Sequence, residues 1–185
     1  MNLYRDAWLR HRDARAIAYA TARADAINDG GLGPELRITD IDRKALDAWE
    51  RSWARRKHRG GAGGWDWPEL VRSGPRRAAV LPVAIWYAED LSGLALGRAS
   101  RSREGGVRHS LTLSFIERRP EPPPVALKGL VVQLVIAIAE NYGRALGASR
   151  LRMSAPDPNL LGWYESFGFE VVQMGGRPLF CTREI

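Results

Sequence analysis

The sequence predicts a single domain of the mixed α/β class. Its 185 residues fall within the range of one domain, and a hydrophobic content of 45% is enough to build a substantial core. The apolar residues follow a helical spacing in the first part of the chain, and from residue 78 onward they follow the spacing of strands. A long apolar helix then interrupts the strands, so both kinds of element contribute to one core.

The chain is strongly basic, with a formal net charge of +7 at pH 7. A charge of this sign suggests an acidic ligand or partner. Three of the 28 basic residues are lysine and the remaining 25 are arginine, a bias that GC-rich coding sequence also produces. The charge alone is therefore weak evidence for a nucleic-acid partner.

Several classes of protein are excluded by composition. No stretch reaches the roughly 18 consecutive apolar residues of a membrane-spanning helix, and residues 1–30 carry charges where a signal peptide needs an apolar run. We therefore expect a cytosolic protein. Cys181 is the only cysteine, which excludes an internal disulfide and a multi-cysteine metal cluster. We expect it to be a small buried hydrophobic residue and expect no metal site.

Helices dominate the sequence before residue 78. Residues 2–28 are expected to form a helix within an N-terminal extension (residues 1–33), with an intermittent apolar stripe of Leu3, Trp8, Ile17, Ala20, Ala24 and Ile27. Residues 36–39 alternate as a short strand, and Thr39 or Asp40 can cap a second helix that reaches about residue 55. A charged, glycine-rich break then precedes a short helix at 68–72.

The central strands are expected within residues 78–120. Residues 78–87 and 94–100 flank a turn and predict a hairpin, and residues 109–117 form a third run. Alternation in that run places Leu113 and Phe115 on one side with Leu111, and Ser114 and Ile116 on the other with Thr112. The prolines at 120 and 122–124 end the run.

Residues 125–185 are expected to form the C-terminal half. A helix over about 125–146 carries apolar residues on several faces, which is typical of a deeply buried helix. Residues 150–153 read as a strand, and the pair Asp157-Pro158 is suited to cap and begin a short helix. Gly168 ends that helix before the last strands at 169–173 and 179–182.

Two segments resemble the GNAT superfamily of N-acetyltransferases. The sequence Tyr-Glu-Ser-Phe-Gly-Phe at 164–169 is similar to the superfamily's Tyr-x-x-x-Gly-Phe ending, and residues 139–153 resemble its passage from helix to strand. The order of expected elements over residues 35–185 matches as well. The resemblance implies a GNAT-like mixed, mostly antiparallel central sheet flanked by helices, here with an extra N-terminal helix. It also implies transfer of an acetyl group from acetyl-CoA to a primary amine.

The resemblance places the acetyl-CoA site where the central strand ends and the long helix begins. Most of the residues that bind acetyl-CoA are therefore expected in the C-terminal half, residues 125–185. The superfamily's glycine-containing pyrophosphate loop is degenerate here, so binding would rest on backbone N–H groups at a positive helix terminus. From the local residues alone, an ordinary connection between strand and helix is the alternative. The expected contacts are Ile116, Arg118, Leu127, Lys128, Gly129, Leu130, Val131, Val132 and Asn159.

In the mechanism that the resemblance implies, the amine attacks the thioester carbonyl directly, and backbone N–H near Arg118 contacts that carbonyl. Tyr164 is the candidate acid for the departing thiolate; alternatively its hydroxyl merely finds a partner. Glu117 is the candidate base, acting directly or through water, and a bulge in the strand would re-aim its side chain. Alternatively, Glu117 pairs with Arg118 or Arg119, and ordered water takes the proton.

Trp65 and Trp67 are candidate substrate-binding residues, because the glycines at 60–64 are suited to a hinge that moves them over a ligand. The basic run 55–59 beside tryptophans is either a nucleic-acid patch or a solvated helix end. Two alternative functions stay open: a GNAT-type toxin that acetylates charged tRNA, and a noncatalytic acyl-CoA-binding protein. The N-terminal helix packs either on its own domain or in a homodimer.

Overall fold

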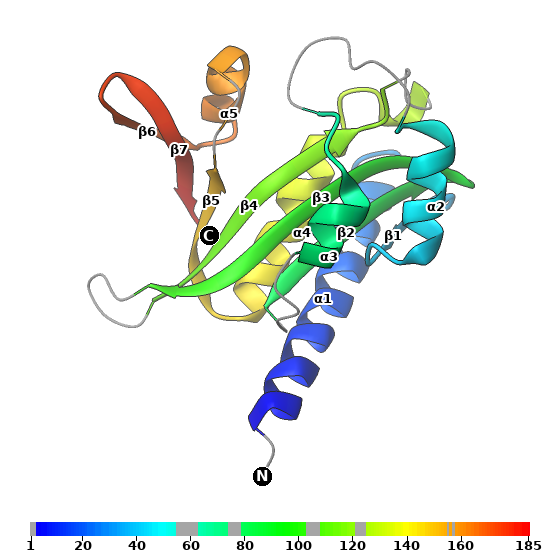
Figure 1. Cartoon of the computed structure of the whole chain (residues 1–185), viewed down its shortest axis with the longest axis horizontal. Helices are drawn as coiled ribbons and strands as arrows, with labels where there is room; N and C mark the ends of the chain where they lie inside the picture. The colour runs from blue at the N-terminus through cyan, green and yellow to red at the C-terminus, as the bar shows by residue number, and fades with distance from the viewer. Residues whose placement is uncertain are drawn as a thin grey trace.

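The computed structural model describes residues 3–54, 63–73, 79–102, 108–120, 125–154, 156 and 158–185. The elements follow the order expected from the sequence (Figure 1). They are α1 (Leu3–Asn28), β1 (Leu36–Thr39), α2 (Arg43–Ser52), α3 (Trp67–Ser73), β2 (Val80–Tyr87), β3 (Asp90–Ser102), β4 (Arg108–Arg118), η1 (Val125–Leu127), α4 (Val131–Ala145), β5 (Ala148–Ser154), η2 (Pro158–Leu160), α5 (Leu161–Ser166), β6 (Glu170–Met174) and β7 (Arg177–Glu184). None of the helices in these ranges combines the length and apolarity that a membrane span requires.

The described strands form one seven-stranded sheet with the order β1-β2-β3-β4-β5-β7-β6. Every neighbouring pair is antiparallel except β4 and β5, which are parallel. A parallel pair needs a crossover, and α4 supplies it. The mixed, mostly antiparallel sheet flanked by helices that the sequence predicts is confirmed.

Helices cover the two faces of the sheet unequally (Figure 1). The larger core lies between the sheet and the pair α1 and α4, and the smaller core lies under α2 and α3. Alternate residues of β2 divide between them: Val83 and Ile85 enter the larger core, whereas Ala84 and Trp86 enter the smaller one. The face of each strand residue can therefore be assigned from the core that it joins.

The apolar stripe expected on α1 is wrong. Trp8 and Ile17 are 43% and 57% exposed, and the face that packs on the domain carries small residues instead. Small side chains let the helix backbone approach α4 and the sheet closely, and Trp8 and Ile17 are left outside. The helix therefore packs on its own domain through His11, Ala14, Ala18 and Ala22.

Polar groups also join α1 to the rest of the fold. His11 Nδ1 and the Tyr142 hydroxyl of α4 share a hydrogen bond of 2.8 Å, and both residues are buried. The Tyr19 hydroxyl lies 2.8 Å from an Asp40 oxygen and 2.6 Å from the Pro82 carbonyl. These bonds fix the orientation of α1, because a buried polar group that loses its partner costs free energy.

Two helix starts differ from the sequence-based expectation. The cap of α2 is Asp42, whose carboxylate accepts from the Ala45 N–H at 2.9 Å, and not Thr39 or Asp40. The long helix begins at Val131 instead of near residue 125, because Gly129 adopts φ +80° and separates η1 from α4. A left-handed residue cannot continue a right-handed helix.

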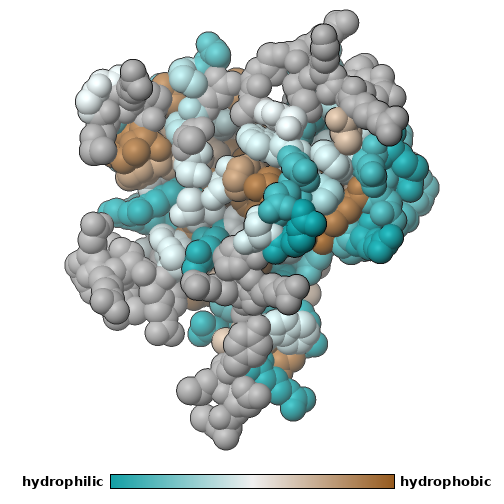
Figure 2. Space-filling model, in the orientation of Figure 1, coloured by the Kyte–Doolittle hydropathy of each residue, from teal (hydrophilic) through white to brown (hydrophobic). Residues whose placement is uncertain are grey.

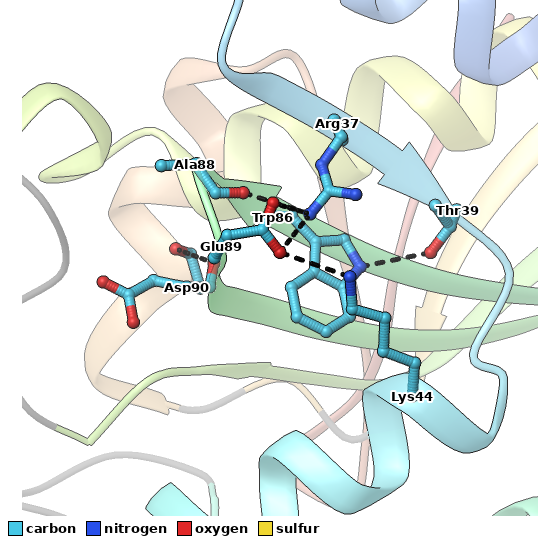
Figure 3. Close-up of polar contacts among 8 residues, drawn as sticks. Arg37, Thr39, Lys44, Trp86, Ala88, Glu89 and Asp90 are labelled. Atoms are coloured by element: carbon cyan, nitrogen blue, oxygen red, sulfur yellow. Dashed lines mark hydrogen bonds and ion pairs between the residues drawn. The ribbon is translucent and has the colours of Figure 1, made fainter.

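The β2–β3 hairpin is fastened to α2 by a charged cluster around Trp86 (Figure 3). Arg37 and Lys44 lie over the Trp86 ring, with the Arg37 Cζ and the Lys44 Nζ 5.6 and 5.3 Å from its centroid. Both cations also contact Glu89 in the hairpin turn, and the hydrogen bond from Lys44 is the main cause that lowers the pKa of Glu89. The turn is tighter than expected because β3 begins at Asp90 and not at residue 94, and Ala88 adopts φ +53°.

Substitution Tyr142→Phe tests the buried contact between α1 and α4. Burial raises the pKa of Tyr142 to about 12, whereas an unfolded tyrosine titrates near about 10. The stabilising contribution is therefore complete below about pH 10 and is lost as pH rises toward about 12, by about 2 to 3 kcal/mol. Urea unfolding at about pH 9 and pH 11.5 should show a larger loss in the wild type than in Tyr142→Phe. Equal losses in both, with Tyr87→Phe as the control, would contradict this assignment.

Candidate functional site

The site is organised by an irregularity in β4. Leu96 of β3 is opposite Phe115, but the next residue, Gly97, is opposite Leu113, so Ser114 is an extra residue in β4. Such a bulge reverses the alternation beyond it. Leu113 accordingly joins the larger core and Phe115 packs against the smaller one, which corrects the expectation that they share a face.

Beyond the bulge, β4 continues without β5. The parallel register runs from His109↔Ala148 to Leu113↔Met153, whereas β4 extends to Arg118 and diverges from β5 (Figure 1). The Arg119 N–H donates to the Ser92 carbonyl of β3 at 3.0 Å. Because N–H directions alternate along a strand, those of Ile116 and Arg118 point the other way, toward the side of β5. Ile116 and Arg118, both expected to contact the cofactor, therefore present their N–H groups along the diverging edge.

The N-terminus of α4 lies over β3 near this edge. A Cβ at Gly93 would come within 2.5 Å of Val131 Cγ1, so the absence of a side chain at Gly93 allows this close approach. No side chain caps the helix, and the N–H groups of its first turn, from Val131 onward, have no partner within the helix. Donors without a partner inside the helix, at a positive helix terminus, form an environment that favours anions.

The residues expected around the pyrophosphate loop occupy different environments. Leu127 is fully buried in the larger core, and Leu130 and Val132 are partly buried against it. Lys128 and Gly129 are exposed. These two leucines and the valine therefore build core, and the groups left for a ligand are the Lys128 ammonium and the backbone.

Glu117 is buried under the segment that leads into α3. The bulge turns its side chain to the face of the smaller core, where one carboxylate oxygen accepts from the Gly64 N–H at 2.9 Å and the other from the Trp67 indole Nε1. It is 1% exposed. Arg119, an alternative partner for Glu117, forms its ion pair with Asp90 at 3.1 Å. Glu117 therefore anchors the segment 64–67 to the end of β4.

The two tryptophans expected at the substrate differ in exposure. Trp67 is completely buried, so its surface is not presented to a ligand in this structure. Trp65 is partly exposed and packs edge-on against Phe115 of β4, with ring centroids 5.4 Å apart. The basic run 55–59 and most of the glycine run lie outside the described residues.

Tyr164 lies on α5 at the border of the larger core and is 8% exposed. Its ring packs against Trp163 and Phe169, with centroids 5.4 and 6.4 Å away. Asn159 is exposed in η2, one turn before α5, and Asp157 lies outside the described residues. Tyr164 therefore belongs to the larger core, whereas the Glu117 side chain lies on the face of the smaller core.

An arginine that the sequence did not single out holds α5 in place. The Arg183 guanidinium of β7 donates to the Phe167 carbonyl at the end of α5 and pairs with Glu140 of α4. It also lies over the Phe169 ring, with its Cζ 5.2 Å from the centroid. Because these partners are 16 and 43 residues away in the chain, no local pattern could have indicated them.

Solved structures with the same fold match most of this chain. The ribosomal-protein-S18-alanine N-acetyltransferase from Escherichia coli is 16% identical over 81% of this chain and 94% of its own, with a TM-score of 0.53. A mutant of the toxin AtaT, bound to the C-terminus of the antitoxin AtaR, is 13% identical over 80% and 91%, with a TM-score of 0.56. Arabidopsis thaliana Naa50 with the bisubstrate analogue CoA-Ac-MVNAL is 10% identical over 82% and 99%, with a TM-score of 0.50. No protein-family model and no curated protein sequence matches the chain.

Substitution Glu117→Gln tests the buried anchor. The amide oxygen can still accept one hydrogen bond, but the amide NH2 faces a donor, so either Gly64 or Trp67 loses its acceptor. We expect the free energy of unfolding to fall by about 1 to 3 kcal/mol, measured by urea unfolding. Glu50→Gln on the exposed side of α2 is the matched control and should change it by less than about 0.5 kcal/mol. Equal effects of the two substitutions would show that Glu117 anchors nothing.

Proposed function

Because the chain has the GNAT fold, we propose that it is an N-acetyltransferase that moves the acetyl group of acetyl-CoA to a primary amine. The observation that carries the proposal is the diverging edge of β4, where the N–H groups of Ile116 and Arg118 point toward β5 after strand pairing has ended. Donors arranged in this way suit a thioester carbonyl and the amide groups of an extended ligand. The related fold of Naa50 in complex with a CoA bisubstrate analogue supports this choice of ligand.

The anionic end of acetyl-CoA is assigned to the start of α4. Its pyrophosphate would accept from the first N–H groups of the helix, at Val131 and Val132, with Lys128 adding a positive charge. Leu127 and Leu130 support this turn from the core, and Gly129 supplies the left-handed residue that the turn requires. Asn159, exposed before α5, is assigned to the opposite side of the cofactor.

The proposed reaction is a direct transfer. The amine nitrogen attacks the thioester carbonyl carbon, the new C–N bond forms, and the C–S bond breaks with its electron pair leaving on sulfur. The backbone N–H of Arg118 stabilises the negative charge that develops on the carbonyl oxygen. Tyr164 donates its hydroxyl proton to the thiolate and regains a proton from solvent.

Glu117 contributes by position in this mechanism. A carboxylate that is 1% exposed and already accepts from Gly64 and Trp67 is poorly placed to contact an amine. We assign it the task of holding the segment 64–67 so that Trp65 forms one side of the acceptor site, with Trp67 locked beneath. The amine proton then passes to water, either to bulk water or to a water molecule near Glu117.

Substitution Tyr164→Phe separates binding from turnover. Calorimetric titration of acetyl-CoA should give a similar Kd for wild type and variant, because the hydroxyl acts on the leaving group. Thiol release, measured with a panel of primary amines, should fall roughly 100-fold. Tyr87→Phe, a remote tyrosine of β2, is the control. No binding at millimolar acetyl-CoA would sink the proposal, and binding without thiol release for any amine would favour a noncatalytic acyl-CoA-binding protein instead.

A further inference from the structure

Part of the sheet face that carries α2 and α3 is left open by the described elements. Those helices lie over the β1 to β3 side, whereas no described helix lies in front of β5 and β7 (Figure 1). Register and alternation assign the side chains of this open face, because Leu111, Leu151, Met153 and Cys181 occupy the opposite, buried face. The open face carries Arg98, Ser100, Ser110, Thr112, Arg150, Arg152, Ser154, Glu170, Val172, Phe180, Thr182 and Glu184.

Three arginines occupy the middle of this face. Thr112 of β4 stands between Arg98 on β3 and Arg152 on β5, so the backbones of the two arginines are about 10 Å apart. Arg150 lies two residues before Arg152 on β5 and therefore on the same face. Arg98 and Arg150 are exposed. Among the described residues, Arg152 Nε is a buried donor with no hydrogen-bond partner. Of the two acidic residues, Glu184 at the end of β7 stands directly opposite Arg150 in the register, and Glu170 lies farther out on β6.

An aromatic ring lies beside the arginines. The Arg152 guanidinium is stacked on Phe180 of β7, with its Cζ 5.1 Å from the ring centroid. Figure 2 shows a hydrophilic stretch in this part of the surface directly next to the hydrophobic β6–β7 hairpin. A stacked Arg–Phe pair flanked by further arginines combines a platform for a planar base with charges for phosphates.

Serine and threonine hydroxyl groups lie beside the arginines on the same face of the sheet. Ser100 and Ser110 lie side by side, with their Oγ atoms 3.0 Å apart, and Thr112 and Thr182 flank Arg152. Each hydroxyl can donate and accept, as the ribose 2′-hydroxyl does. This composition favours RNA over an acidic polypeptide, which would use the charges but not the stacking platform.

The open face leads to the acceptor side of the site. Beyond the bulge, Phe115 and Glu117 belong to the same face, and Trp65 packs on Phe115. We propose that this face binds single-stranded RNA, with a base on Arg152–Phe180 and phosphates on Arg98 and Arg150, and that the RNA brings the acceptor amine to the end of β4. The second clause rests on the proposed acetyl transfer, whereas RNA binding does not.

Fluorescence anisotropy with a labelled mixed-sequence RNA of about 12 nucleotides tests the binding face. The two proposed phosphate contacts on a single strand give a slope of log affinity against log salt of about −1.4, so affinity should fall about sevenfold between about 50 and 200 mM salt. Arg98→Gln and Arg150→Gln should each reduce the steepness of the slope by about 0.7. Phe180→Leu should weaken binding about tenfold at fixed salt and leave the slope unchanged.

Arg43→Gln is the matched control, because Arg43 is a 93% exposed arginine on α2 and should leave RNA binding unchanged. Thermal melts establish that each variant is folded. No RNA binding at about 50 mM salt, or an equal loss in Arg43→Gln, overturns the proposal. Equal affinity for DNA of the same sequence overturns the choice of RNA, and equal binding of polyglutamate overturns nucleic acid.

Acetyl-CoA titration of the same samples keeps the two proposals apart. Absent RNA binding with intact acetyl-CoA binding contradicts the RNA face and leaves the acetyltransferase assignment standing. Absent acetyl-CoA binding with intact, salt-dependent RNA binding contradicts the acetyltransferase assignment and leaves the RNA face standing.

Discussion

The extra residue Ser114 in β4 is the constraint on which the site depends. Up to Leu113, β4 pairs with β5 on one edge and β3 on the other. Past Ser114, pairing with β5 has ended, and Glu117 and Phe115 have changed faces. A bulge bends and twists a strand locally. One residue therefore both frees the backbone donors of Ile116 and Arg118 and carries Glu117 to the segment 64–67.

The two faces of the sheet contribute different kinds of group. The α4 face supplies backbone donors: the helix terminus approaches β3 because Gly93 has no side chain, and Gly129 allows the turn before it. The opposite face supplies side chains, with Glu117 and Trp65 near the end of β4 and the arginines farther along the sheet. This division suits a cofactor with amide and phosphate groups, which backbone N–H groups can bind, on the α4 side, and an acceptor amine, which side chains select, on the opposite side.

The parts of the fold with strong local patterns could be predicted from the sequence. The apolar residues of α4, the strands around 80–118 and the final hairpin repeat at spacings that reflect burial, and the order of elements followed. Packing of α1 could not be predicted, since alanines at 14, 18 and 22 carry a weaker signal than Trp8 and Ile17, which are exposed. Steric needs of the partner surface, and not hydrophobicity, select the buried face.

The candidate site could be predicted from the sequence less completely than the fold. A bulge in β4 could be anticipated, but its position at Ser114 could not. That position is defined by the pairing of β4 with β3, which the sequence of β4 alone does not contain. The partners of Glu117 are 50 and 53 residues away, so the sequence offered only its neighbours Arg118 and Arg119. Arg183 contacts Phe167 and Arg152 contacts Phe180 because the order of strands in the sheet brings these residues together. Long-range pairing, which sequence periodicity does not carry, decides these contacts.

Amide hydrogen exchange followed residue by residue, with and without acetyl-CoA, tests the central claim most directly. Acetyl-CoA should slow exchange at Ile116 and Arg118 and through residues 129–133, because those N–H groups gain acceptors. The amide of Arg119, already bonded to Ser92 of β3, should change little. Unchanged exchange at Ile116 and Arg118 when acetyl-CoA is bound would contradict the claim that the diverging edge of β4 holds the cofactor.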